Sequence, residues 1–565
     1  MKDKREARYI LMFKKLIVKI ESIQAPFHAW LLGFFGIIFA KIFLENFSMR
    51  RFLNLPHDFY STFVHYPLFY FTVFFILTLT LYLVTKERIE KISKFVAFIF
   101  LLEWLHPITD ILVHAFTGKI FIQGYLITSP FNLSKLYIAF LGPLAKYGAT
   151  PGMRLQIIVL FALLFAYVRL KTQSTRKSIL ALFLIYTFLF IIGSLPTVVF
   201  ASYQIFTGGP LDVNEISIIE TLTGIFSRTP LFEGAAKGAL PRINFNLPME
   251  SWDRFLSWIY TLLAGVFMAL WFKIWNGEKW KAMVRNARPL WITTYFSFIV
   301  IGILISCYLG LSGHFGFGFW VSLIVLLLVF IAIYLISINL NDFYDVSIDL
   351  VSNKNRPLVT GALVPEDISK INLALSVFSF FAAASLGFEI LFLLLVISGI
   401  SYIYSAYPFR FKRIFIFSNL LLGLGITFVA PLGFIVASGL SVIYFPFKFL
   451  GLLFVVLLSF FGFTKDIKDS EGDEKAAIIT LANRFPGKTA LLLMTGFLFA
   501  SAILSGIFFR SFLIGAVSIF ISFIAAKFIF ETPFAENKLY VLFYLYFLVI
   551  ALILYFLPHY NISSF

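Results

Sequence analysis

Long apolar runs recur along this chain and leave few choices of fold. A helix of about 20 apolar residues crosses the hydrocarbon layer of a bilayer, and such runs cover residues 63–84, 178–206, 291–309 and 540–557, among others. Of the 565 residues, 60% are hydrophobic and only 13% are charged. Inside a bilayer the backbone must satisfy its own hydrogen bonds, so these runs are predicted to be helices. The sequence therefore predicts an all-α polytopic membrane protein.

Clusters of lysine and arginine give the expected topology of the first half, because basic residues gather in short cytoplasmic loops. Such clusters lie at residues 2–19, 86–94, 169–177 and 273–288. Two predicted spans separate each cluster from the next, so all four fall on one side. The six spans are expected near residues 28–46, 63–84, 95–117, 153–170, 178–206 and 254–273. The polar stretch 207–253 is then predicted to lie outside the cytoplasm.

The second half is predicted to hold nine helices. They are expected at residues 289–309, 318–340, 370–386, 389–405, 414–439, 446–464, 488–510, 511–531 and 537–557. Loops on one side carry most of the basic residues, whereas those on the other carry little beyond Lys448 and Arg510. We therefore expect a multi-pass protein of the cytoplasmic membrane. The charged linker 276–288 predicts two domains, an N-terminal one at residues 1–284 and a second at residues 285–565.

A cluster of aspartates follows the predicted span that ends at Leu340, on the basic side of the membrane. It lies in the stretch NDFYDVSIDLVSNKNRPLVTG. If that helix continues for two more turns, Asn341, Asp345 and Asp349 share one face, and Asp342 joins them.

A second cluster, in KDIKDSEGDEKAAIITL, follows the span that ends at Thr464. Its members Asp466, Asp469 and Asp473 are spaced by three and four residues. One charged stretch after a transmembrane helix is usually a solvated loop. Two with helical spacing on the same side, both among basic residues, favour a shared site.

Carboxylates this close together repel one another unless a cation joins them. The donors are all hard oxygens, which favours Mg²⁺, or Mn²⁺, over zinc or copper. Because Mg²⁺ commonly bridges carboxylates and substrate phosphates, the two clusters predict a diphosphate held by metal ions. A diphosphate at a membrane surface indicates a ligand with a lipid tail. Basic loop residues are expected to contact the remaining phosphate oxygens: Lys354, Arg356, Arg410, Lys412 and Lys465.

These motifs carry a family resemblance. The stretch NDFYDVSID, with NKNRPLVTG after it, resembles the first aspartate-rich motif of the UbiA superfamily of intramembrane prenyltransferases, and KDIKDSEGDEKAAIITLANRF resembles the second. The segment YIYSAYPFRFKR is similar to the family's tyrosine-containing basic loop, although Lys412 follows Tyr407 by five residues instead of four. The resemblance covers residues 285–565 and implies a nine-helix UbiA-like bundle, preceded here by about six further transmembrane helices.

The resemblance implies a Mg²⁺-dependent enzyme of isoprenoid, lipid or quinone biosynthesis. It would move a prenyl group from a polyprenyl diphosphate to a small aromatic or lipid acceptor. Asp466 or a neighbouring carboxylate is expected to help remove the acceptor's proton, and Tyr407 is expected to join the diphosphate site together with Asn341. We expect contact with membrane lipid and none with nucleic acid. The residues expected to bind metal are Asn341, Asp342, Asp345, Asp349, Asp469 and Asp473.

The alternative is a transporter or channel in which the acidic residues form a cation vestibule. A vestibule needs acidic residues that continue into a pore. The predicted helices between residues 289 and 557 contain almost none beyond the two motifs, apart from Glu389 and Glu531. The enzyme interpretation is therefore favoured.

The first half has one notable constellation of its own. The stretch EWLHPITDILVH places Glu103, His106, Asp110 and His114 on one face of a predicted helix with Pro107 inside it. Ionisable residues within a membrane are costly and are functional candidates by default. A metal site or proton relay is one interpretation, and a polar contact between helices is the other. A single Glu-x-x-His is only half of a di-iron carboxylate site.

Overall fold

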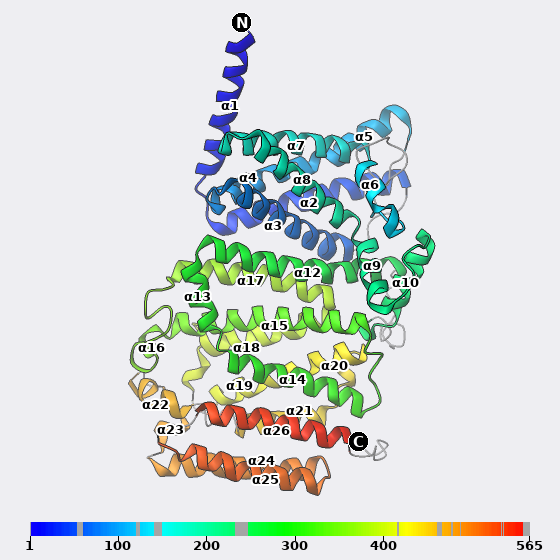
Figure 1. Cartoon of the computed structure of the whole chain (residues 1–565). Coiled ribbons are helices and arrows are strands. Elements are labelled where there is room, and N and C mark those ends of the chain that lie inside the picture. Colours follow the sequence, from blue (N-terminus) through cyan, green and yellow to red (C-terminus); the bar gives the residue numbers. More distant parts are fainter. Residues whose placement is uncertain are drawn as a thin grey trace. The chain divides into compact units, whose positions relative to one another are not determined.

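The computed structural model describes residues 2–53, 60–119, 125–139, 150–231, 247–414, 417–459, 466–475, 478–485, 487–532, 534 and 536–556. All regular structure in these ranges is helical. Twelve helical segments among them are long and apolar enough to cross a membrane. The prediction of an all-α polytopic membrane protein is therefore confirmed. The chain forms two compact units, residues 1–226 with 242–277 and residues 227–241 with 278–565 (Figure 1).

In the first unit, six candidate spans lie where the apolar runs predict them. They are Phe27–Phe47, Ser61–Thr85, Ile89–Thr117, Pro151–Thr172, Thr175–Gly193 and Asp253–Trp275. The helices of this unit are α1 (Lys2–Ser22), α2 (Phe27–Leu53), α3 (Tyr66–Thr85), α4 (Ile89–Ile99), α5 (Leu105–Thr117), α6 (Leu133–Ala139), α7 (Pro151–Thr172), α8 (Thr175–Gly193), α9 (Leu195–Thr207), α10 (Glu215–Ser227) and α12 (Leu247–Trp275). Helix α3 is the most buried of these spans and packs against α4, α8 and α12.

Two predictions for the first unit need correction. The single helix expected at 178–206 is broken, because α8 ends at Gly193 and α9 begins at Leu195 with Pro196 in its first turn. Proline has no N–H, so the helical hydrogen-bond ladder is interrupted there. The stretch 207–253, expected to be a polar loop, contains α10 and the start of α12. Residues 232–246 lie outside the described ranges.

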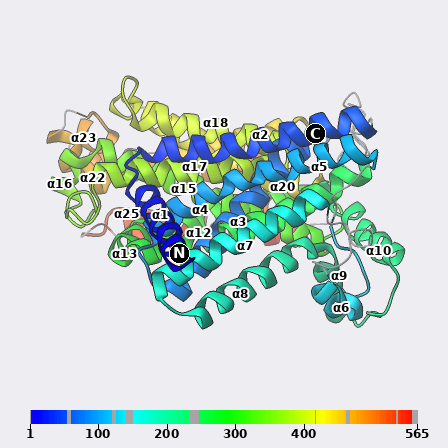
Figure 2. The ribbon, with the colours of Figure 1, turned by 90° about the horizontal axis from the view of Figure 1, so that it is seen from above.

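The second unit has helical counterparts for the predicted spans. Its helices are α13 (Gly277–Asn286), α14 (Pro289–Tyr308), α15 (Phe317–Tyr344), α16 (Val346–Ser352), α17 (Pro365–Leu386), α18 (Phe388–Ser405), α19 (Phe417–Thr427), α20 (Val429–Ser438), α21 (Phe447–Leu457), α22 (Asp466–Lys475), α23 (Leu481–Arg484), α24 (Lys488–Phe508), α25 (Phe512–Ile529) and α26 (Glu536–Phe556). Helices α15, α17 and α18 pack on one another and run in similar directions in both views (Figure 1, Figure 2). The number of spans in this half stays a prediction.

The helix expected at 414–439 is divided in the structure. Helix α19 ends at Thr427 and α20 begins at Val429, with Phe428 between them. Pro431 follows in the first turn of α20, and its nitrogen cannot donate to the carbonyl of Thr427. The division bends the segment where it borders the cavity described below.

Helices α14 and α20 approach each other backbone to backbone. A Cβ atom built on Gly302 would lie 1.8 Å from the carbonyl oxygen of Ala430, and one on Gly433 would lie 1.9 Å from that of Ile299. Only glycine fits at these two crossing points. In a bilayer, close approach of this kind is a main source of helix association.

Candidate active site

The first aspartate cluster lies where α15 ends. This helix continues one turn past Leu340 to Tyr344, and Asp345 interrupts it with φ −106° and ψ 10° before α16 begins. The predicted continuation for two full turns is therefore only partly realised. The amide of Asp345 still donates to the carbonyl of Asn341 (3.0 Å), and that of Asp349 to the carbonyl of Asp345 (2.8 Å). Asp345 and Asp349 are both buried.

A cavity of about 200 Å³ borders this cluster. Its acidic lining comes from Asp345 and Asp349 and, on helix α22, from Asp473. Helix α22 packs against α16, which brings the two aspartate motifs to one cavity although more than a hundred residues separate them. The amide of Asn341 lines the same end, and its Oδ1 accepts a hydrogen bond from Ser405 (3.2 Å).

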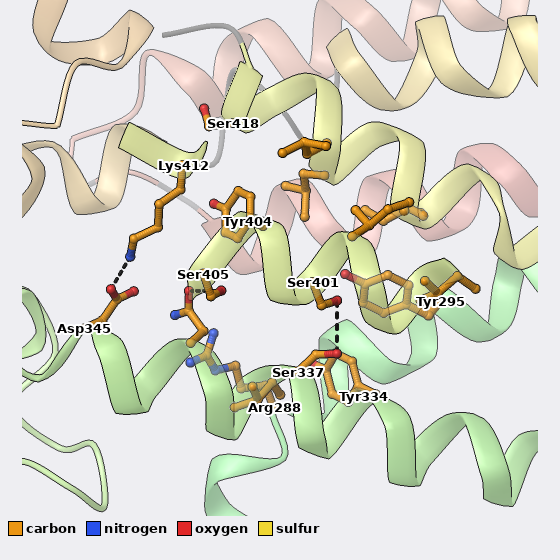
Figure 3. Close-up of a pocket in the computed structure, with 18 of the residues that line it drawn as sticks. Arg288, Tyr295, Tyr334, Ser337, Asp345, Ser401, Tyr404, Ser405, Lys412 and Ser418 are labelled. Carbon is orange, nitrogen blue, oxygen red and sulfur yellow. Dashed lines mark hydrogen bonds and ion pairs between the residues drawn. The ribbon is translucent and has the colours of Figure 1, made fainter. Parts of the chain in front are cut away.

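The rest of the cavity is mainly apolar and aromatic. Asp345 and Lys412 lie at one end of the row of labelled residues in Figure 3, and Tyr295 lies at the other. The rings of Tyr295 and Tyr334 are 5.3 Å apart between centroids, and Ser337 donates to Ser401 (3.1 Å) across the cavity wall. The apolar lining residues include Phe330, Ile333, Ile338, Ile397, Ile400, Leu421, Leu422, Ile426 and Val429.

Cationic side chains from three loops reach this cavity: Arg288, Arg356 and Lys412. Lys412 forms an ion pair with Asp345, and Nη2 of Arg410 lies 3.1 Å from the same carboxylate oxygen. Nη1 of Arg410 donates to the hydroxyl of Tyr407 (2.8 Å), and this hydrogen bond lowers the pKa of Tyr407. Asp345 is therefore held between two buried cations.

Asp342 has different surroundings from its neighbours. Its side chain is buried, and it does not line the cavity. One carboxylate oxygen accepts from Asn286 (2.8 Å) and the other from Arg288 (2.7 Å). Asp342, predicted to join the metal ligands, thus fixes Arg288 beside the cavity in this structure.

Asp349 is a buried carboxylate whose negative charge is only partly compensated. Burial raises its pKa from 3.8 to about 6, and the charges of Asp342 and Asp345 act in the same direction. The charge of Arg356 and a hydrogen bond from Asn353 (3.0 Å) oppose this rise only in part. A nearby divalent cation would stabilise the ionised form of Asp349.

Several predicted site residues lie elsewhere or cannot be placed. Lys354 is exposed and Tyr407 is 51% exposed, and both lie outside the cavity lining. Lys465 and the side chains of Asp466 and Asp469 fall outside the described part of the chain. Within that part, no three His, Cys, Asp or Glu side chains are grouped so that they could hold a metal ion by themselves.

The sequence analysis missed Asn286 and Arg288. Both lie in the charged linker before Pro289, which was interpreted only as a domain boundary. Their partner Asp342 is more than fifty residues away in the sequence, so nothing local indicated the pairing.

In the first unit, the structure brings together three of the four residues of the polar constellation. Nε2 of His106 lies 3.0 Å from Oδ2 of Asp110, and Glu103 is held nearby by a hydrogen bond from Gln156 (2.7 Å). His114 is apart from them, with its Nδ1 3.1 Å from the carbonyl oxygen of Lys119. Glu103 belongs to a short 3₁₀ helix, η2 (Phe100–Trp104), so the predicted α-helical spacing is not kept.

Comparison with known proteins finds relatives of the second half of the chain. Residues 298–548 match the UbiA prenyltransferase family. The 2-acylphloroglucinol 4-prenyltransferase of Humulus lupulus is 28% identical over 167 residues, which are 28% of this chain and 40% of that protein. The digeranylgeranylglyceryl phosphate synthase of Korarchaeum cryptofilum (strain OPF8) is 27% identical over 155 residues, 27% of this chain and 53% of that protein. The chain thus matches about half, or less, of the length of these relatives.

Among solved structures, the chain shows similarity to that of a UbiA homolog from Archaeoglobus fulgidus bound to DMAPP and Mg²⁺. It is 21% identical, covers 48% of this chain and 99% of its own, and has a TM-score of 0.38. The family match begins at residue 298 and leaves the first unit outside it. As the two aspartate-rich motifs predicted, residues 298–548 of the chain match the UbiA prenyltransferase family.

Proposed function

We propose that the second half of the chain transfers a prenyl group from a polyprenyl diphosphate to an aromatic or lipid acceptor in a Mg²⁺-dependent reaction. The observation that carries this proposal is the meeting of both aspartate motifs at one end of a cavity that is otherwise apolar. A diphosphate suits the charged end, and an isoprenoid tail suits the apolar end. The names of the two curated relatives, a prenyltransferase and a synthase of a geranylgeranyl lipid, support the same class of reaction.

The residues at the charged end fit a hard divalent cation together with a phosphate. Asn341, Asp345, Asp349 and Asp473 offer only oxygen donors, which is the set that Mg²⁺ prefers. Since the described side chains do not complete a metal site by themselves, phosphate oxygens would supply further ligands. When bound, Mg²⁺ would neutralise the charge that develops on the departing diphosphate.

The cations of the cavity bind and orient the diphosphate. Arg288 is fixed by Asp342, so its guanidinium is held at the cavity without the entropy cost of ordering a free side chain. Lys412, which pairs with Asp345, has a flexible stem that lets its ammonium group turn to a phosphate oxygen. These groups stabilise negative charge on the diphosphate as the allylic C–O bond breaks.

The aromatic end of the cavity protects the electron-poor prenyl carbon. The faces of Tyr295, Tyr334 and Phe330 attract a cation through their π electrons. The acceptor then forms the new bond to the prenyl carbon and loses a proton, for which Asp466 remains the proposed base. The surrounding apolar side chains exclude water, which would otherwise capture the same carbon.

The test uses the full-length protein in lipid nanodiscs, with geranylgeranyl diphosphate as the donor. Release of diphosphate is measured with Mg²⁺ and with excess chelator, and prenylated products are identified by mass spectrometry of added lipid and aromatic acceptors. We expect release only with the metal. Equal release in the presence of chelator would contradict the proposal. The lipid that disappears from cells lacking the protein would identify the acceptor.

We propose that the charged end of the cavity faces the cytoplasm, because basic residues are concentrated in the loops on that side. With Cys307 replaced, a cysteine at Ser352 should react with an impermeant reagent only from the cytoplasmic side. A cysteine at Ser217 should react only from the other side. Labelling of both from one side would contradict this orientation.

A further inference from the structure

Five ionisable side chains meet inside the first unit, on α2, η2 and α5. They are Lys41, Glu45, Glu103, His106 and Asp110, and all lie within the candidate spans Phe27–Phe47 and Ile89–Thr117. Lys41 is 1% exposed and His106 is 4% exposed. Burying charge in a membrane is costly, so the positive and negative charges of such a group must balance one another.

His106 is central to this group because each of its ring nitrogens faces a carboxylate. Nδ1 lies 3.3 Å from Oε1 of Glu45, and Nε2 lies 3.0 Å from Oδ2 of Asp110. A neutral imidazole has one N–H and one lone pair. If both carboxylates were ionised, that lone pair would face a negatively charged oxygen. Both contacts can be hydrogen bonds only if one more proton is present.

We propose that Glu45, His106 and Asp110 form a proton-binding site within the membrane-spanning region. The triad holds one proton more than a neutral imidazole and two carboxylates would carry. The proton resides on the imidazole, or on one of the two carboxyl groups that face it. This site belongs to the first unit and is independent of the prenyl-transfer proposal.

The other groups around the triad favour the extra proton. Lys41 pairs with Oε1 of Glu45 (2.6 Å), and its ammonium lies 5.1 Å from the ring centre of Tyr70. Glu103 adds a third carboxylate beside the same lysine. Three ionised carboxylates would outnumber Lys41, so a bound proton reduces the excess of buried negative charge.

The remaining contacts on the neighbouring helices are with hydrogen-bond donors. From α7, the amide of Gly152 donates to Oδ1 of Asp110 (2.7 Å), and Gln156 donates to Glu103 (2.7 Å). Helix α7 also carries the buried Arg154. From α3, Tyr70 hydrogen-bonds to Glu103, and Tyr66 lies with its ring centre 5.5 Å from the ammonium of Lys41.

Two further observations favour the bound proton and its exchange. Oε2 of Glu45 is buried and has no hydrogen-bond partner, so an ionised Glu45 would carry buried negative charge that is not fully compensated. The side chains of Glu45 and Asp110 are 11% and 15% exposed.

The experiment measures the protonation state of His106 in the full-length protein in liposomes by solid-state NMR. Leu105–His106 is the only Leu–His pair in the sequence, so labelling the leucine carbonyl carbon and the histidine carbons and nitrogens selects this residue without a mutation. Spectra are recorded at pH 8, where an ordinary histidine is about 97% neutral. His114 is the matched control on the same helix. Labelling valine selects both His114 and His65, and the signal that disappears in His114→Gln is the one that belongs to His114.

Infrared spectroscopy at the same pH completes the test by detecting protonated carboxyl groups. We expect either two protonated ring nitrogens on His106, or a protonated carboxyl band that is absent from Glu45→Gln or Asp110→Asn. His114 should be neutral in the same sample. A neutral His106 ring, together with no carboxyl band that depends on Glu45 or Asp110, would overturn the proposal.

Discussion

Buried carboxylates occur in both halves of the chain, and what surrounds them differs. In the second unit, Asp345, Asp349 and Asp473 line a cavity that continues between apolar helices. In the first unit, Glu45 and Asp110 face the ring of a single histidine, and their further contacts are with Lys41 and with the amide of Gly152. The first arrangement leaves room for a ligand, whereas the second accommodates a proton.

This comparison shows that residue type alone does not decide what a buried acid binds. Asp342 makes the same point within one motif, since it lies three residues from Asp345 and yet has both oxygens engaged by Asn286 and Arg288. The partners on neighbouring helices decide whether a carboxylate is available. The predictions below change one side of this comparison at a time.

The largest effect is expected from removing charge at the cavity. Asp345→Asn or Asp473→Asn should lower the rate of diphosphate release by about 100-fold or more, as expected when a group that stabilises transition-state charge is lost. The side chains keep their volume, but Asp345→Asn leaves Lys412 and Arg410 without their counter-charge, so the folding of each variant is checked by thermal unfolding before its activity is compared. Glu366→Gln, at an exposed acid in the first turn of α17, is the matched control. Full activity in Asp345→Asn would contradict the proposed site.

A smaller effect is expected at Asp342, where the loss is in stability. Asp342→Asn leaves Arg288, which is 26% exposed, without its counter-charge. We expect a loss of about 1–3 kcal/mol in the free energy of unfolding, below the value for a fully buried pair because Arg288 reaches solvent. Thermal unfolding in detergent measures it. The control is Glu278→Gln, which breaks the exposed pair with Lys281 and should leave the melting temperature unchanged. Equal shifts of the melting temperature in both variants would contradict the proposal that Asp342 stabilises the protein through Arg288.

The pH dependence of stability should report Asp349. Its pKa of about 6 in the folded protein exceeds the ordinary value of 3.8, so between these values the folded state binds more protons than the unfolded state. The contribution of Asp349 to stability is then greatest below about pH 4 and is lost as the pH rises to about 6. Asp349→Asn should remove this loss. Melting curves in detergent without Mg²⁺ check it, and an unchanged slope in the variant would assign the titration to another group.

The smallest effect is expected from deleting the first unit together with residues 227–241, the short segment of the second unit that precedes α12. A chain that begins at Gly277 keeps α13, whose Ala282 packs with Leu363 and Ile368 and whose Lys279 pairs with Asp367 (2.7 Å). It should retain Mg²⁺-dependent diphosphate release in nanodiscs. If the shortened protein is folded and shows no release, the first unit contributes to the active site and the division of function between the halves is wrong.

Much of the fold could be predicted from sequence because the bilayer restricts it so strongly. Apolar runs of sufficient length located the six spans of the first unit, and most ends lie a few residues from those observed. The exceptions are the span predicted to begin at residue 95, which begins at Ile89, and the span predicted to end at residue 206, which ends at Gly193. The breaks at Ser194 and Phe428 were missed, although Pro196 and Pro431 were available as signals. Whether proline kinks a helix or ends it depends on what its neighbours pack against, and the sequence does not show that.

The candidate site was predicted in part, since spacing within each motif is local information. The meeting of Asp473 with Asp349 followed only from both lying on one side of the membrane. Partners from distant segments could not be derived, as Arg288 for Asp342 shows. Lys41 and Glu45 could have been noticed, because a charged pair four residues apart within an apolar run is itself a signal.

The glycine contacts between α14 and α20 bear on how the cavity could be altered. Tyr295 of α14 and Val429 of α20 both line it, and Gly302 and Gly433 hold these two helices at a distance that no larger residue permits. The part of the cavity wall that α14 and α20 form is therefore rigid. A donor with a longer tail would therefore have to be accommodated by the lining residues of α15, α18 and α19. Attempts to widen the donor range should change Ile397, Ile400 or Leu421 and leave the two glycines intact.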